Sequence, residues 1–278
     1  MGCGSGVKLR SSTAQPFPRT IPAASHDSSL FPSVNQFHLP DKSSPFPKSF
    51  CKVPPRLRRN RNDDSCRMKI IVTCGPSYEP IDEARRLTNF STGRLGITFA
   101  NALAAAGHEV FCLKGEQATC PDPLRVREAL AFSTNEDLAG KLEGLSRAHE
   151  FGAVLHAAAL CDFRVDRVVA GDGREVSSRK FSTGEGELHL VLAPTLKVLP
   201  KLRAWFPRAR LVGWKYELAG TREEAFAAAW RQLQETDVDA CVLNGAAYGS
   251  GFALCRRPDR VETCADLPAL VEWFRRWL

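Results

Sequence analysis

The segment NFSTGRLG, residues 89–96, places hydroxyl groups, glycine and a cation directly before an apolar helical pattern. If a helix begins near Arg94, the amides and hydroxyls of Ser91, Thr92 and Gly93 lie at its positive end, where an anion is stabilised. Arg94 adds a positive charge to the first turn. The pattern therefore predicts a phosphate-binding loop. A simple N-cap, formed by Ser or Thr before a helix, explains the same hydroxyls without a ligand.

The elements that would hold this loop alternate along the chain from Met68 onward. Short apolar or β-branched runs predict strands, and longer runs with a 3.6-residue period predict helices. Helix ends are indicated by Gly107, by Asn135 as a candidate N-cap, and by Thr221 with Glu224 as a capping box. The predicted strands are residues 69–74, 109–113, 153–160, 188–192, 209–217 and 239–244, with another inside 124–132. The predicted helices are residues 94–107, 135–149, 221–236 and 265–278, with a short one inside 193–206.

Strands separated by helices predict βαβ units. The expected fold class is therefore α/β, a Rossmann-like, mostly parallel sheet flanked by helices, with a late β-hairpin at residues 251–264. The polar stretch 161–187 is rich in glycine and charge and predicts irregular structure. Ligands of such sheets bind beyond the carboxyl ends of the strands, which here carry CGPSYEP, KGEQ, ALCDF, WKYE and NGAAYG.

Residues 1–67 are expected to form a basic extension, and residues 68–278 the α/β domain. The extension holds nine of the 18 prolines and eleven serines, and its composition predicts disorder. A targeting segment, or sequence upstream of a true start at Met68, explains the composition equally well. The extension also carries the whole excess charge of +7, because residues 68–278 hold 27 basic and 27 acidic residues. Charge therefore gives no argument for nucleic-acid binding.

No apolar run approaches the ~18–20 residues that span a bilayer, and no early segment resembles a secretion signal. The ten cysteines contain no C-x-x-C spacing, and Cys74, Cys112, Cys161 and Cys241 fall within apolar runs. Buried free thiols in a reducing compartment explain them. We therefore expect a cytoplasmic protein with neither a membrane partner nor protein-held metal, and organelle targeting by residues 1–67 stays open.

Four segments resemble, in order, the ligase domain of the phosphopantothenoylcysteine synthetase (phosphopantothenate–cysteine ligase) family. TCGPSYEPIDEARRLTNFSTGRLG at residues 73–96 is the longest and most specific of them. AALCDFR at 158–164, GWKYEL at 213–218 and VLNG around Asn244 follow. Residues 1–67 are too few for the flavin-dependent decarboxylase of bifunctional members, so we expect the ligase domain alone.

The resemblance implies an enzyme of coenzyme A biosynthesis. Family members activate the carboxylate of 4′-phosphopantothenate with CTP or ATP, form an acyl-nucleotidyl anhydride and release pyrophosphate. The amine of cysteine then attacks the activated carbonyl. The resemblance also implies Mg²⁺ beside the nucleotide triphosphate, and a homodimer whose subunits meet near the site.

By the same resemblance, Asn89 steadies the anhydride, and Arg179, Lys180 and Lys215 are catalytic cations. A neutral donor at Asn89 suits an oxygen that gains negative charge. A turn residue at Asn89, and solvated charges at Arg179 and Lys180, are the alternatives without function. The residues that match the family's nucleotide-binding segments are Gly75, Ser91, Thr92, Gly93, Arg94, His156, Ala157, Ala158, Asp162 and Trp214.

Several positions depart from the family pattern. Ser177 stands where the family has the first lysine of a mobile loop, Pro76 replaces a glycine, and Leu196 replaces a proline. Asp162 as a loop cap, and Trp214 as a core aromatic, need no nucleotide. The choice between CTP and ATP therefore stays open, as does a diverged homologue that binds nucleotide or phosphopantothenate without ligation. An NAD(P)-binding Rossmann oxidoreductase is less favoured, because no G-x-G-x-x-G follows the first strand.

Overall fold

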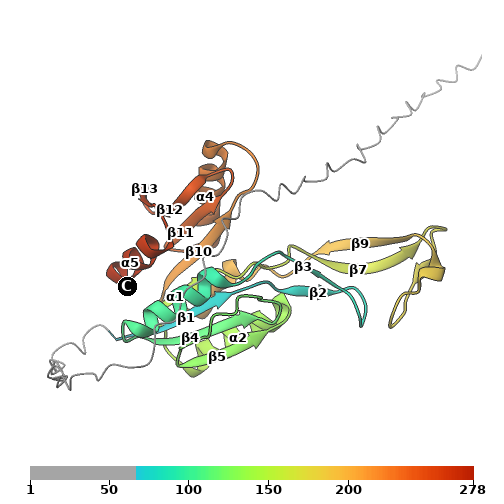
Figure 1. Ribbon diagram of the computed structural model, residues 1–278, viewed down its shortest axis with the longest axis horizontal. Helices are drawn as coiled ribbons and strands as arrows, with labels where there is room; N and C mark the ends of the chain where they lie inside the picture. The colour runs from blue at the N-terminus through green and yellow to red at the C-terminus, as the bar shows by residue number, and fades with distance from the viewer. Residues whose placement is uncertain (1–66) are drawn as a thin grey trace, which may run out of the picture. The chain divides into compact units, whose positions relative to one another are not determined.

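The computed structural model describes residues 67–278, so the predicted extension lies outside the described residues except for Arg67. The strands of the central sheet are β1 (Lys69–Cys74), β4 (Glu109–Gly115), β5 (Glu128–Phe132), β6 (Ala153–His156), β10 (Arg210–Tyr216), β11 (Ala240–Gly245), β12 (Gly249–Arg256) and β13 (Arg260–Cys264). Their order is β13-β12-β11-β10-β6-β1-β4-β5 (Figure 1). The six strands from β5 to β11 are parallel, and the hairpin β12–β13 joins them antiparallel. The predicted fold class is confirmed.

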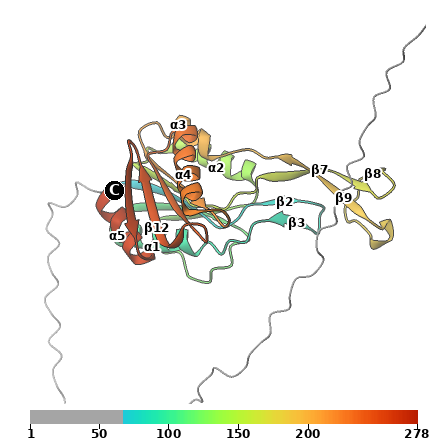
Figure 2. The ribbon, with the colours of Figure 1, turned by 90° about the horizontal axis from the view of Figure 1, so that it is seen from above.

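Helices cover both faces of the sheet, as Figure 2 shows. They are α1 (Arg94–Ala105), α2 (Asn135–Ala148), α3 (Leu202–Trp205), α4 (Arg222–Thr236) and α5 (Leu267–Trp277), with 3₁₀ turns η2 (Thr183–Glu185) and η3 (Leu199–Lys201). Alternate residues of β1 point to opposite faces: Ile70 and Val72 pack in the core beneath α1 and α5, and Ile71 in the core beneath α2, α3 and α4. Among residues 67–278, no helix is long and apolar enough to cross a membrane.

Residues 161–187 are not irregular, so that prediction was wrong. The strands β7 (Phe163–Ala170), β8 (Glu175–Val176) and β9 (Leu188–Pro194) form a separate three-stranded antiparallel sheet. Val168, Ala170 and Val176 are buried on one face of it, while the other face carries Arg164, Arg167 and Glu175 beside smaller apolar residues. A register shift between Val165 and Arg167 breaks the simple alternation that would have indicated a strand. We call residues 163–194 the arm.

A second short hairpin, β2 (Tyr78–Pro80) and β3 (Arg86–Thr88), was also not predicted. It lies beside the arm in both ribbon views (Figures 1 and 2). The strand predicted at 153–160 is regular only as far as His156. The following residues stay beside the chain that continues β1: the amide of Ala157 donates to the carbonyl of Thr73, that of Ala159 to the carbonyl of Gly75, and Pro76 and Ala159 form an isolated parallel bridge.

Helix α1 lies unusually close to β1 at Gly96. An ideal Cβ built on Gly96 would lie 2.3 Å from the Cβ of Cys74, a distance that real side chains do not reach. Glycine at this position therefore sets how near the helix, and the loop before it, come to the carboxyl end of β1.

We expect Gly96→Ala to destabilise the domain by about 1–3 kcal/mol, because the added methyl group must push α1 away from Cys74. Urea unfolding followed by tryptophan fluorescence measures the change. Gly140→Ala in α2 is the matched control, since Gly140 is exposed and a Cβ there meets nothing within 4 Å. The control should keep or gain stability, and equal stability of the two variants would contradict the close contact.

Candidate functional site

A cleft of about 440 Å³ opens at the carboxyl ends of β6 and β10, between helix α4 and the loops that follow β6 and β9. Three cations from three different elements line it: Lys197, Lys215 and Arg231. The carboxylates Asp162 and Glu235 also lie on its walls. The excess of positive charge suits an anionic ligand.

The loop that is predicted to bind phosphate lies at the N-terminus of α1. Gly93 is the N-cap, with φ +77° and no side-chain cap, and the first turn holds no acidic residue. The hydroxyl of Thr92 accepts the amide of Arg94 at 3.3 Å, and Ser91 precedes it in the loop. Gly75 meets this loop, because an ideal Cβ on Gly93 would lie 3.3 Å from the Gly75 Cα. The structure thus brings these five predicted residues together around an uncapped helix end.

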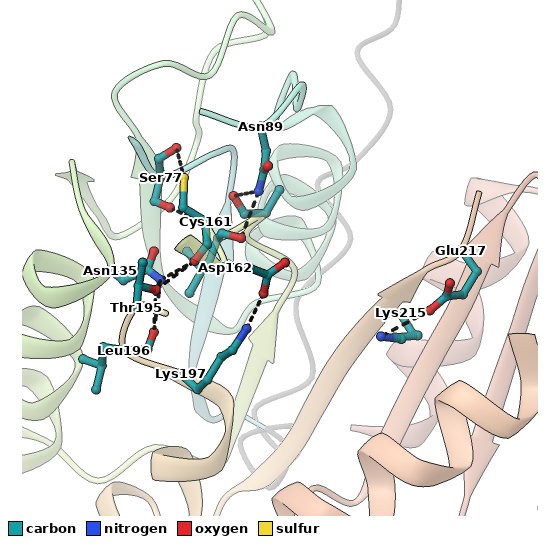
Figure 3. A network of polar contacts seen from close by, with 12 residues as sticks. Ser77, Asn89, Asn135, Cys161, Asp162, Thr195, Leu196, Lys197, Lys215 and Glu217 are labelled. Atoms are coloured by element: carbon teal, nitrogen blue, oxygen red, sulfur yellow. Dashed lines mark hydrogen bonds and ion pairs between the residues drawn. The ribbon is translucent and has the colours of Figure 1, made fainter. Parts of the chain in front are cut away.

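Asn89 connects the phosphate loop to the wall of the cleft. Its amide nitrogen donates to the carbonyls of Ala159 and Leu160, at 3.3 and 2.9 Å (Figure 3). The side chain is exposed. Both amide hydrogens have acceptors, so the Oδ1 oxygen is the atom that Asn89 offers without rearrangement.

His156, Ala157 and Ala158 are organised by the side chain and carbonyl of Thr73. The hydroxyl of Thr73 lies 2.8 Å from Nδ1 of His156 and accepts the amide of Ala158 at 3.3 Å, and its carbonyl accepts the amide of Ala157. Burial of the imidazole lowers the pKa of His156 to about 4. His156 is therefore neutral at physiological pH and adds no charge beside the cleft.

Asn135 is not the N-cap of α2, contrary to the sequence prediction. Thr134 caps the helix by accepting the amide of Asp137. Asn135 is instead buried beside the cleft, and its amide nitrogen lies within hydrogen-bonding distance of three acceptors (Figure 3). These are the carbonyl of Cys161 at 2.8 Å, the hydroxyl of Thr195 at 2.6 Å and the carbonyl of Leu196 at 3.0 Å. The loop after β6 is thereby joined to the loop after β9.

Two of the three cations of the cleft have acidic partners. The ammonium of Lys197 pairs with the carboxylate of Asp162, and that of Lys215 lies 3.2 Å from Glu217 (Figure 3). Sequence reasoning found Asp162 and Lys215 but missed Lys197, and it gave Asn135 only as a candidate N-cap. Arg231 is one of the two cations, with Arg222, that the sequence of helix α4 offers to a phosphate, and it lines the cleft.

Trp214 takes part in the core on the α1 and α5 face of the sheet. Its ring stacks on Phe274, with centroids 6.0 Å apart and an interplanar angle of 18°, and meets the edge of Phe99 at 5.7 Å. One face of the indole is therefore covered by protein. Nucleotide stacking on Trp214 stays a prediction.

The cations Arg179 and Lys180 lie in the arm, not on the walls of the cleft. Arg179 forms a bidentate pair with Glu83, in the turn between β2 and β3. The structure therefore divides the predicted catalytic residues into two groups. Asn89 and Lys215 lie at the carboxyl ends of the strands of the central sheet, whereas Arg179 and Lys180 lie in the arm.

Fold and site together define a Rossmann-like α/β domain. The N-terminus of α1, which has no side-chain cap, lies beside a cleft with an excess of positive charge. The chain belongs to the family described as DNA/pantothenate metabolism flavoprotein C-terminal domain, whose model matches residues 66–261. The family expected from the sequence is confirmed.

Similar proteins point the same way. The coenzyme A biosynthesis bifunctional protein CoaBC of Thermococcus kodakarensis is 30% identical over 183 residues, covering 66% of this chain but 42% of that protein. The chain thus spans less than half the length of this relative. The crystal structure of the DNA/pantothenate metabolism flavoprotein from Streptococcus pneumoniae matches with a TM-score of 0.67 at 21% identity, over 76% of this chain and 97% of that one. A Cab2 H337A mutant in complex with phosphopantothenate-cysteine matches with a TM-score of 0.58 at 15% identity, over 75% and 86%.

We expect the free energy of unfolding to fall by roughly 3 kcal/mol between pH 6.5 and pH 4 through His156 alone. The unfolded imidazole takes up a proton near 6.5, whereas the folded one does so only near 4, so acid favours the unfolded chain. The contribution is complete above pH 6.5 and is lost as the pH falls to 4. Urea unfolding of wild type and His156→Gln at a series of pH values isolates it, because all other groups are shared. A difference between the two proteins that stays constant with pH would contradict a buried neutral imidazole.

Proposed function

We propose that this chain is a ligase that joins 4′-phosphopantothenate to cysteine in coenzyme A biosynthesis, using CTP or ATP. The observation that carries the proposal is the position of Asn89, between the uncapped end of α1 and the cationic cleft. A nucleotide triphosphate at the helix end and an acid in the cleft would meet beside this side chain. Membership of the family and the relative named for coenzyme A biosynthesis support the same reaction.

In the proposed reaction, the carboxylate of phosphopantothenate attacks the α-phosphorus of the nucleotide and pyrophosphate leaves. The amine of cysteine then attacks the carbonyl carbon of the acyl-nucleotidyl anhydride, loses a proton and releases the nucleoside monophosphate. The protein mainly has to hold two anions together and stabilise the charge that develops on oxygen. Gly75, Ser91, Thr92, Gly93 and Arg94 would bind the triphosphate. Lys215 would face the reacting groups from β10.

Magnesium would enter this site on the nucleotide. In the part of the chain that the structure describes, no three His, Cys, Asp or Glu side chains gather closely enough to hold a metal ion. Mg²⁺ binds mainly phosphate oxygens and water, with few protein ligands, so the nucleotide itself would supply most of its ligands. The ion would neutralise part of the triphosphate charge, while the residues of the α1 loop orient the phosphates. The proposed ligands are small molecules, and we place the reaction in the cytoplasm.

The departure at Ser177 favours a second candidate, a diverged homologue that binds the substrates without joining them. Pyrophosphate release by the full chain separates the two candidates. It is measured with phosphopantothenate and magnesium, with CTP or ATP, and with or without cysteine. Release that depends on phosphopantothenate, with amide formed once cysteine is added, supports the ligase and identifies its nucleotide.

Asn89→Asp should lower the rate of pyrophosphate release by about 100-fold or more, because a carboxylate repels the anionic oxygens that the neutral amide tolerates. The exposed side chain contributes little to the core, so the unfolding midpoint should stay near that of wild type. Asn101→Asp on α1 is the matched control: it keeps the oxygen that accepts the amide of Arg125 and loses only the donor to Pro123. A similar loss of rate in both variants would contradict the role of Asn89.

We also propose that two copies of the chain associate through the arm. Phe163, Leu190 and Leu192 lie on one face of the β7–β9 pair and are 48%, 40% and 45% exposed. Towards the tip of the arm the same face is covered by Val176 and Phe181. The uncovered apolar strip suits an identical strip on a second copy, since most soluble homo-oligomers are two-fold symmetric.

The double variant Leu190→Asp with Leu192→Asp should sediment as a monomer, because association would bury four unpaired carboxylates against apolar side chains. Wild type should sediment as a dimer under the same conditions in analytical ultracentrifugation. His189→Asp is the control, because His189 is exposed and alternates to the other face of β9. A monomeric wild type would contradict the proposed contact.

A further inference from the structure

The turn between β2 and β3 folds around the carboxylate of Asp82, whose side chain is fully buried. This carboxylate accepts the amides of Ala84 and Arg85, at 2.8 and 2.7 Å, and also pairs with the Arg85 guanidinium. It further accepts the amide of Phe181, from the arm, at 3.2 Å. The turn therefore holds the arm with the same group that organises the turn itself.

Further contacts join the turn to the arm. Arg85 donates to the carbonyl of Phe181 at 3.0 Å, and the amide of Glu83 donates to the carbonyl of Arg179 at 2.9 Å. The guanidinium of Arg179 in turn donates to both carboxylate oxygens of Glu83, at 2.6 and 2.8 Å. A bidentate pair of this kind fixes orientation as well as distance. We call this group of five residues the clasp: Asp82, Glu83, Arg85, Arg179 and Phe181.

Lys180 lies between two residues of the clasp. Its backbone is held by Ser178, whose hydroxyl donates to the Lys180 carbonyl at 2.9 Å and accepts the Lys180 amide at 3.2 Å. Phe181, the next residue, is buried in the apolar cluster of the arm. Within residues 67–278, the ammonium of Lys180 has neither a hydrogen bond nor an ion pair. The backbone is fixed, and the charge is left to solvent or to a ligand.

Arg179 and Lys180 therefore differ in what they offer an anion. The charge of Arg179 is already matched by a carboxylate, and two of its nitrogens are occupied. The pair is exposed, with 87% of the Arg179 side chain and 59% of the Glu83 side chain accessible. An exposed pair contributes little to stability. Its consequence is geometric, because it sets the position of the residue that follows Arg179.

We propose that Arg179 is a positioning residue that acts through Glu83, and that Lys180 is the cation which the clasped arm presents to a substrate phosphate. The inference rests on the proposed ligase function and revises the role that the family resemblance gives to Arg179. Because Ser177 stands in place of the family's first lysine, the proposal leaves Lys180 as the one cation among residues 177–180 that is available to the substrate.

The direction in which E83Q changes kcat shows whether Arg179 positions Lys180 or binds the phosphate itself. Pyrophosphate release by the full chain is measured for E83Q, R179Q, K180Q and the reversed pair E83R/R179E. We expect K180Q to lower kcat about 100-fold, as loss of a charge that stabilises the reacting phosphate does. E83Q and R179Q should each lower kcat on the order of 10-fold, through misplacement of Lys180, and the reversed pair should recover most of that loss. Unfolding midpoints of all four variants should stay close to wild type.

If Arg179 itself bound the phosphate, E83Q would free it and would leave kcat unchanged or raised, and the reversed pair would be inactive. Either result overturns the proposal. R174Q is the matched control, because Arg174 is an exposed arm cation that pairs with Glu185 at 3.3 Å, outside the clasp. It should keep the wild-type kcat, and a loss equal to that of R179Q would show a general charge effect and overturn the proposal.

Calorimetric binding of CTP and ATP keeps this inference separate from the ligase proposal. If wild type binds a nucleotide but releases no pyrophosphate, the ligase proposal fails and Lys180 is judged by affinity. A nucleotide Kd about tenfold weaker in K180Q would then support the role of Lys180, and an unchanged Kd would overturn it. If wild type neither binds nucleotide nor releases pyrophosphate, both proposals fall.

Discussion

The site depends on how closely α1 can approach the carboxyl end of β1. Gly96 makes this approach possible, because a Cβ there would meet the Cβ of Cys74 at 2.3 Å. Two further glycines let the loop after β1 pack against β4 and the loop that follows it: a Cβ on Gly75 would meet Ala118 at 2.7 Å, and one on Gly115 would meet the carbonyl of Pro76 at 2.1 Å. With α1 in this position, the loop before it runs close enough for Asn89 to reach the carbonyls after β6. The close packing is thus what places the end of a helix dipole beside the cleft.

On the other side of the cleft, one buried amide has a comparable role. Asn135 lies within reach of three acceptors from two loops but has only two hydrogens to donate, and its own oxygen is buried without a partner in the described chain. A buried polar group without a partner costs about 1–3 kcal/mol. The hydrogen bonds that the amide nitrogen of Asn135 donates offset part of this cost. The same bonds join the two loops that form the walls of the cleft, which an apolar side chain could not do.

The parallel sheet and its helices could be predicted from sequence, because buried strands and amphipathic helices leave periodic patterns. The position of the loop before α1 was predictable for a related reason, since Ser91, Thr92, Gly93 and Arg94 are contiguous. The arm was not, because a register shift interrupts its alternation and charged residues dominate its composition. The pairs Lys197–Asp162 and Arg179–Glu83 were also beyond prediction. They join residues 35 and 96 positions apart, and no local pattern records which surface charges will meet.

The distribution of carboxylates among the cations has a consequence for anion binding. Lys197, Lys215 and Arg179 each have an acidic partner, whereas Arg94, Arg231 and Lys180 have none within residues 67–278. A phosphate that meets a paired cation must compete with its carboxylate, although an exposed pair of this kind is worth only ~0–1 kcal/mol. At an unpaired cation the phosphate gains the whole interaction. Pairing therefore limits the repulsion among neighbouring cations before a ligand arrives, and it concentrates the net gain from binding at the three cations that have no acidic partner.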